Sequence, residues 1–259
     1  MLFRVVGTNV YVCGSIHLLP VGTVLPQAML DAVGASDHCI FETDIDNWSE
    51  PSYARFQAPE TIKNHITAEL YLNTEALCEA LSLPGLLPEL QPWFVALFLG
   101  IRLIARDGFT SESGVDAQLL KAARLAGKSV FRLEADSTIG FASAPMSEHI
   151  DRLTFVVLDP QRSIDIFQQI HAAWRIGDTD ALERLNDVQL KLFPVSTRAL
   201  IDDRNRQWLP GFLGAIQAGR RAVFVVGAFH LVGENGLQRL LENHGYKLEL
   251  IATAGSVPS

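Results

Sequence analysis

Short runs of apolar residues alternate along the chain with stretches in which apolar residues recur at helical spacing, the pattern of an α/β protein. The clearest run, Ala222 to Val226, has no polar interruption and predicts a strand covered on both faces, as in a parallel sheet. Helical spacing follows from Leu237 to Leu241, and Tyr246 to Ile251 predicts another strand. These segments form a strand, helix and strand unit.

The same strand, helix and strand pattern occurs near the start of the chain. Val10 to Cys13 predicts a strand, Pro26 to Val33 a helix and His38 to Phe41 a second strand. Phe3 to Val6 precedes this unit and should pair with Val10 to Cys13 as a hairpin. We therefore predict an α/β fold with a central mixed, largely parallel sheet, built from two related strand, helix and strand halves with helical insertions.

Two segments, at about 48–113 and 137–218, are mainly helical in pattern, and we interpret them as parts of a single domain over residues 1–259. The helix predicted at Gln91 to Arg106 carries about ten consecutive apolar residues, fewer than the ~20 that cross a bilayer. We expect it to be buried or to cover an apolar groove, without a stable membrane span. A second helix, Thr197 to Gln217, should be kinked or split at Pro210.

Histidines and glutamates follow the predicted strands. The first strand of each half leads into a G-x-x-H sequence, which ends in His17 or in His230, while Glu42 and Glu134 directly follow two further strands. The carboxyl ends of parallel strands meet at one sheet edge, where α/β proteins hold ligands, so we predict one cleft for these four side chains. The glycines would let the backbone turn sharply and present each imidazole.

One arginine is predicted to face the same cleft. Arg204 lies on the apolar stripe of its helix and should point inward, where a guanidinium needs a carboxylate or an anion. We expect it to pair with Glu42, Glu134 or a bound anion, and a purely structural ion pair explains the pattern equally well. The acidic residues Asp44 and Asp46, just beyond Glu42, are as typical of a solvated loop as of a site.

These residue types support two chemistries. His17, Glu42 and His230 could bind a catalytic divalent metal, because two imidazoles and a carboxylate leave coordination positions open for water and substrate. Without a metal, one histidine could act as a general base oriented by a glutamate, with Arg204 stabilising a developing anion. The chain has no H-E-x-x-H sequence, which excludes an ordinary zincin.

The amino-acid composition disfavours some classes of binding partner. A net charge of −8 and a pI near 5.3, with no cluster of lysine and arginine, argue against nucleic acid or an anionic membrane as partner. Cys13, Cys39 and Cys78 lack C-x-x-C spacing, which disfavours a disulfide framework or a structural zinc site. The first residues contain no charged leader before an apolar stretch, so we expect a cytoplasmic protein as given, or a periplasmic or secreted one if a signal peptide was removed.

Six segments in order resemble the signatures of the TraB/GumN family, which is related to the Tiki proteases and, distantly, to the erythromycin esterases. They are YVCGSIHLLP, FETD, QPWFVALFL, GVDAQLLKAARLAGKSVFRLE, DDRNRQWL and VVGAFHLVGENGL. The resemblance implies an α/β core of two related halves, with His17, Glu42 and His230 at the active site. Arg204 and Asn205 would support them, and the candidate substrate-binding residues are Asn205 together with Asp116 and Glu134 from the fourth segment.

The relatives imply more than one activity. The Tiki proteases imply a metal-dependent peptidase, with manganese or cobalt as the metal and zinc as a further candidate, whereas the esterases imply hydrolysis by a histidine base. The pheromone-shutdown role associated with TraB proteins implies instead a non-catalytic protein that sequesters a peptide. We expect a hydrolase of a peptide or small molecule, most simply a metallopeptidase, and assembly into a homo-oligomer stays open.

Overall fold

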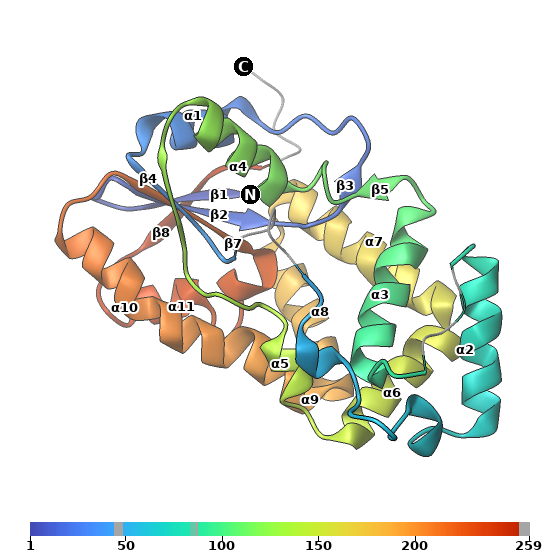
Figure 1. Cartoon of the computed structure of the whole chain (residues 1–259). Helices are drawn as coiled ribbons and strands as arrows, with labels where there is room; N and C mark the ends of the chain where they lie inside the picture. The colour runs from blue at the N-terminus through green and yellow to red at the C-terminus, as the bar shows by residue number, and fades with distance from the viewer. Residues whose placement is uncertain (44–48, 84, 86–87, 254–259) are drawn as a thin grey trace.

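The computed structural model describes residues 1–43, 49–83, 85 and 88–253, in which a six-stranded sheet lies beside a group of helices (Figure 1). The strands follow the order β6 (Ser129–Arg132), β4 (His38–Phe41), β7 (Ala222–Gly227), β2 (Val10–Ser15), β1 (Leu2–Val5) and β8 (Leu248–Ala252). In this sheet as described, β1 alone runs in the opposite direction to the other five strands. The predicted mixed, largely parallel sheet is confirmed.

The two halves meet at the centre of the sheet. Strands β2 and β7 pair in parallel there, with Ser15 opposite Gly227, and each leads through a helix to a more distant strand. Helix α1 (Gln27–Ala35) connects β2 to β4, and α11 (Leu237–Glu242) connects β7 to β8. Helices α1 and α4 (Val115–Leu125) cover one face of the sheet, while α10 (Arg204–Gln217) and α11 cover the other (Figure 1).

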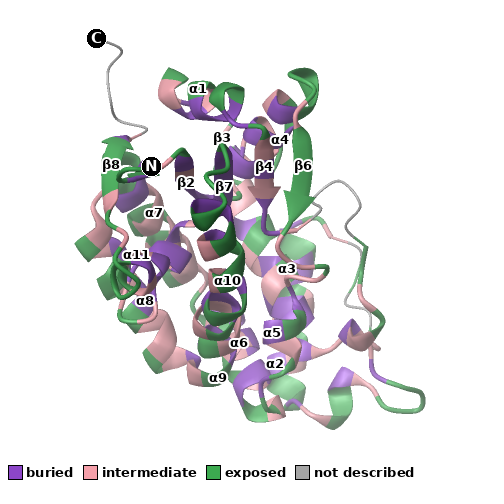
Figure 2. Cartoon of the chain, turned by 90° about the vertical axis from the view of Figure 1, so that its left-hand side faces the viewer, coloured by how far each residue is buried: buried purple, intermediate pink, exposed green. Residues whose placement is uncertain are grey.

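The central strands are buried on both faces, as their uninterrupted apolar sequences require (Figure 2). On one face the ring of Phe212, from α10, stacks on Phe224 of β7 with 3.8 Å between centroids. Full burial of one such aromatic side chain contributes roughly 1.5–3 kcal/mol. The edge strand β6 is exposed along its whole length, so the apolar core lies under β4, β7 and β2.

The remaining helices form a second apolar core. Phe56, Leu99 and Leu153 belong to the buried residues that α2, α3, α6 and the preceding loop bring together. The helices of this part are α2 (Ala68–Ala80), α3 (Pro92–Ala105), α5 (Ile139–Ala142), α6 (Met146–Leu158), α7 (Pro160–Ile176), α8 (Thr179–Leu192) and α9 (Pro194–Arg198), with single turns at Ser52–Ala54 and Ile62–Asn64. Strands β3 (Leu19–Pro20) and β5 (Phe109–Thr110) form a small separate sheet.

The apolar helix predicted at Gln91 to Arg106 is α3, and half of its residues are buried, whereas Phe98 and Ile101 are exposed. Within the described residues, no helix is long and apolar enough to span a bilayer.

Two local details differ from the sequence predictions. Of the predicted kink or split at Pro210, the split is wrong, because α10 continues through this residue, and a π-helical turn lies earlier, at Ala199–Asp203. The glycines of the two G-x-x-H sequences do not form sharp turns, because neither Gly14 nor Gly227 has a positive φ angle. Gly14 lies within β2, where a Cβ atom would approach Leu231 Cδ1 to 2.7 Å, so close packing, not chain reversal, requires glycine there.

We predict opposite stability effects for two glycine substitutions. Gly114 precedes α4, and a Cβ there would overlap the carbonyl oxygen of His17, so Gly114→Ala should lower the free energy of unfolding by about 1–3 kcal/mol. Gly100, within α3, has open space beside it, and Gly100→Ala should raise that free energy by about 0.5–1 kcal/mol. Urea unfolding monitored by circular dichroism measures both, and equal stability of the two variants would contradict the packing argument.

Candidate active site

Four neighbouring strands deliver the candidate residues to one edge of the sheet. Glu134 follows β6, Glu42 follows β4, His230 lies in a single 3₁₀ turn after β7, and His17 follows β2 by two residues. Since these strands are adjacent and parallel in the order β6, β4, β7 and β2, their carboxyl ends meet, as the sequence predicted.

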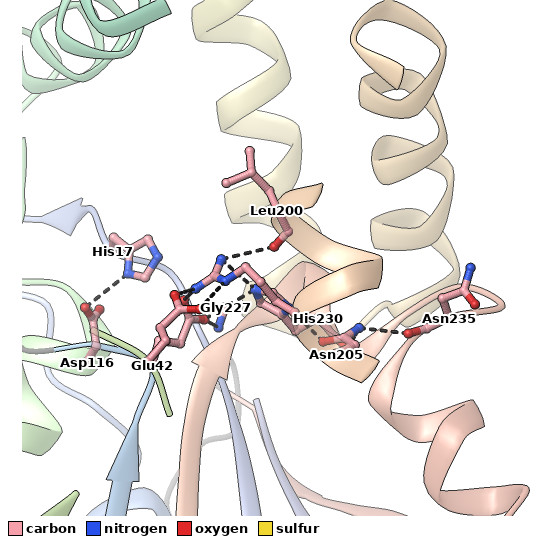
Figure 3. A network of polar contacts seen from close by, with 10 residues as sticks. His17, Glu42, Asp116, Leu200, Asn205, Gly227, His230 and Asn235 are labelled. Carbon is pink, nitrogen blue, oxygen red and sulfur yellow. Dashed lines mark hydrogen bonds and ion pairs between the residues drawn. The ribbon is translucent and has the colours of Figure 1, made fainter. Parts of the chain in front are cut away.

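Arg204, at the start of α10, is the centre of a buried polar network at this edge (Figure 3). Its Nη2 donates to Glu42 Oε2 at 2.7 Å and to Glu134 Oε1, and its Nε donates to Glu134 Oε2 at 3.0 Å. Its Nη1 donates to the carbonyl oxygen of Leu200 at 3.0 Å, and the guanidinium lies 4.5 Å from the ring centroid of Trp208. The predicted inward arginine, paired with both glutamates, is confirmed.

Two carboxylates share this single guanidinium. Burial alone would raise the pKa of Glu42, but the electrostatic effects of His230, Arg204 and His17, together with the Gly227 N–H bond, lower it to about 2. Burial raises the pKa of Glu134, an effect that its contacts with Arg204 do not reverse. Glu42 is therefore the firmly ionised member of the pair.

The imidazole of His230 is buried and neutral. Asn205 Nδ2 donates to the carbonyl oxygens of His230 and Asn235, at 3.1 and 2.8 Å, so its Oδ1 is left to accept from His230 Nδ1 at 2.8 Å. That bond leaves His230 Nε2 unprotonated, 3.3 Å from Arg204 Nη1 and 3.6 Å from Glu42 Oε1. Burial lowers the pKa of His230 to about 3, which keeps the ring uncharged at neutral pH.

His17 has a different environment. Its Nδ1 lies 3.0 Å from Oδ2 of Asp116, a residue in the first turn of α4, and its side chain is 61% exposed whereas that of Asp116 is 12% exposed. The Asp116 carboxylate raises the pKa of His17, and water around the exposed ring screens part of this effect. When His17 is neutral, its Nδ1–H is directed at Asp116 and its Nε2 atom carries the lone pair.

Gly227 gives Glu42 its second hydrogen bond. The backbone N–H of Gly227 donates to Glu42 Oε1, and a Cβ at this position would lie 3.2 Å from the same oxygen and 3.5 Å from His230 Cδ2. Glycine is therefore needed here so that the Glu42 carboxylate can approach the backbone closely. This reason differs from the sharp turn that we predicted from the sequence.

A small cavity connects the His17 pair with the Arg204 network. Its volume is about 10 Å³, and the polar residues that line it are Ser15, His17, Glu42, Thr43 and Asp116. Glu42 thus contacts Arg204 on one side and this cavity on the other. Ser15 was not among the predicted site residues, although it lies inside the first G-x-x-H sequence, between Gly14 and His17.

Comparison with known proteins places the chain in a family. The model of the TraB/PrgY/gumN family matches residues 2–250. The chain belongs to this family. The "Uncharacterized protein YbaP" of Escherichia coli (strain K12) is 28% identical over 236 residues, which cover 89% of this chain and 87% of YbaP. The protein of the same name from Shigella flexneri has the same identity and coverage.

In this TraB/PrgY/gumN protein, the predicted site residues form two groups. Glu42, Glu134, Arg204, Asn205 and His230 form one hydrogen-bonded network, in which Asn205 positions His230. His17 and Asp116 form a separate pair across the cavity. Asp44 and Asp46 lie outside the described residues.

The predicted metal ligands only partly match what a metal needs. Both histidines have Nδ1 bonded to an oxygen, which leaves each Nε2 available as a ligand atom, as in many metal sites. Arg204 Nη1, however, lies beside His230 Nε2, and no three His, Cys, Asp or Glu side chains of the described residues are spaced to hold an ion as they lie. Metal binding therefore stays a prediction, and we derive no chemical step through a metal.

We predict that Arg204→Lys destabilises the protein far more than the same change two residues away. Lysine cannot reproduce the planar contacts with two carboxylates, so breaking this buried pairing should lower the free energy of unfolding by about 3–5 kcal/mol. Arg206→Lys, on the exposed face of α10, should cost under about 1 kcal/mol. Urea unfolding of both variants checks this, and equal costs would show that the buried network contributes little.

Acid sensitivity should depend on Glu42. The pKa of Glu42 is lowered in the folded state from 4.5 to about 2, so its ionised form contributes stability above pH ~4.5, and that contribution is lost as pH falls towards 2. The stability difference between the wild type and Glu42→Gln should shrink by about 2 kcal/mol between pH 7 and pH 3, measured by urea unfolding at pH 7, 5, 4 and 3. Glu242→Gln, at an exposed position, is the control. A pH-independent difference for Glu42→Gln would contradict the assignment.

Proposed function

We propose that this protein is a hydrolase that cleaves an acyl bond in a peptide or small-molecule ester, with His17 as the general base. The observation that carries the proposal is the exposed His17 ring, fixed on one nitrogen by the buried Asp116 carboxylate, beside a cavity walled by Glu42. In its neutral form, an imidazole held in this way keeps one tautomer, in which Nε2 carries the lone pair that would accept a proton.

Each residue of the pair would have a defined task. His17 Nε2 would take a proton from the attacking water and return it to the leaving group, while Asp116 would stabilise the imidazolium formed in between. Glu42 adds a negative charge on the cavity wall, which also favours protonated His17. His17 and Asp116 are therefore the proposed catalytic pair, supported by Glu42.

Arg204 fits a positioning role better than contact with a substrate anion. A guanidinium has five N–H donors, and all five have acceptors within the protein, on Glu42, Glu134, Leu200 and His230. None is left for an oxyanion while the side chains lie in this arrangement. Arg204 instead fixes the Glu42 carboxylate against the cavity.

A metal-dependent peptidase is the second candidate. It is favoured by the hydrogen bonds of His17 and His230, because each neutral ring is bonded through Nδ1 and leaves its Nε2 lone pair as a ligand. A bound manganese or cobalt ion would supply activation of water, and His17, Glu42 and His230 are the residues that would hold it. Arg204 would have to move away from His230 Nε2 for that ion to bind.

The decisive experiment combines substitution with control of the metal. Hydrolysis of a peptide and ester library by metal-free protein should persist, and His17→Ala should lower kcat by at least ~10²-fold while the fold, checked by circular dichroism, persists. His244→Ala, a matched exposed histidine, should leave kcat unchanged.

Each alternative function predicts a different result in this experiment. Activity that appears only with manganese or cobalt, and is lost in His230→Ala as in His17→Ala, would establish the second candidate. Tight binding of a peptide without cleavage of any library member would replace the hydrolase by a sequestering protein.

A further inference from the structure

Two buried polar atoms without protein partners belong to residues that line the small cavity. Neither Ser15 Oγ nor Asp116 Oδ1 has a hydrogen-bond partner in the described part of the chain, and both residues line the cavity. Ser15 is 2% exposed and Asp116 is 9% exposed. A buried carboxylate oxygen or hydroxyl without a partner costs about 1–3 kcal/mol, so two at one place call for a common partner.

The size of the cavity restricts what this partner can be. Its volume of about 10 Å³ matches the ~10–15 Å³ that a single water molecule needs and is too small for any organic ligand. Glu42 also lines this cavity and supplies a third polar group, its carboxylate. Phe41, Thr43 and Val225 complete the lining. A buried water typically makes two to four hydrogen bonds, and this number of partners is present.

We propose that one ordered water molecule occupies this cavity and bridges Ser15 to Asp116. The hydroxyl of Ser15 donates to the water oxygen, one water hydrogen is donated to Asp116 Oδ1 and the other is directed at Glu42. This arrangement satisfies both atoms and uses each hydrogen once.

The sheet explains why Ser15 is at this position. It is the last residue of β2 and lies opposite Gly227, whose N–H holds the Glu42 carboxylate on the neighbouring strand end. Asp116 approaches from the other side, because the N–H of Val115 donates to the carbonyl oxygen of Ile16 at 3.0 Å and fixes the start of α4. The cavity between them is therefore defined by backbone contacts.

The water gives Ser15 a positioning role that rests on the proposed function. With Oδ1 engaged by water, Asp116 keeps its Oδ2 on His17 Nδ1, so the orientation of the general base depends on a hydroxyl that never contacts the substrate. Ser15→Ala removes the donor that holds the water, and Asp116 can then rotate away from His17. We expect kcat to fall about 10-fold or more, with KM changed less than about twofold.

A high-resolution crystal structure of the wild-type protein tests directly for the water. This test does not depend on an activity measurement. Density for one water within 3.2 Å of Ser15 Oγ and Asp116 Oδ1, absent in Ser15→Ala, supports the proposal. Density for a metal ion, or a Ser15 hydroxyl bonded to a protein carbonyl with no water present, overturns it. If the water is present but the wild type hydrolyses nothing, the bridge stands and the proposed function fails.

Kinetics test the positioning role. Ser15→Thr keeps the hydroxyl and should retain most of the kcat that Ser15→Ala loses. Ser36→Ala removes an equally buried hydroxyl, bonded to the Ala32 carbonyl far from the cavity, and should leave kcat unchanged. An equal loss of kcat in Ser15→Ala and Ser36→Ala, or no loss in Ser15→Ala, would refute the role of Ser15.

Discussion

A single buried guanidinium holds the carboxyl edge of the sheet together. Arg204 begins the helix α10 on one face and bonds the carboxylates that follow β4 and β6, and it approaches the imidazole that follows β7. Desolvating such a charge is tolerated only when all its donors have partners, which is the case here. The orientation of the Glu42 carboxylate, and with it one wall of the adjacent cavity, depends on this one side chain.

The two G-x-x-H sequences show how similar sequences acquire different chemistry. His230 is covered by α10 and Asn205, so burial lowers its pKa, whereas His17 faces solvent with Asp116 behind it, and its pKa is raised. Two histidines whose environments shift their pKa values apart are suited to different tasks. The duplicated unit therefore yields one exposed, basic imidazole and one neutral, structural imidazole.

Much of this arrangement could be predicted from local patterns. The apolar runs identified the strands, parallel strands made convergence of His17, Glu42, Glu134 and His230 at one edge necessary, and the apolar stripe around Arg204 indicated its inward direction. What could not be predicted depends on close approach between distant segments. The fit of Gly227 to Glu42, the pairing of Asp116 with His17 and the cavity at Ser15 join residues that lie 99 or more positions apart or have no local signature.

The π-helical turn at Ala199–Asp203 directly precedes Arg204 and contributes the Leu200 carbonyl that the guanidinium contacts. A π turn contains one residue more than an α-helical turn, and such turns are frequent at functional sites. Each residue advances an α-helix by about 100°, so without the extra residue Arg204 and Asn205 would face a different direction relative to α9. The direction in which this arginine points is thus encoded by the length of a helical turn as well as by the choice of side chain, and a one-residue deletion there could disconnect α10 from the sheet edge without altering any residue of the site.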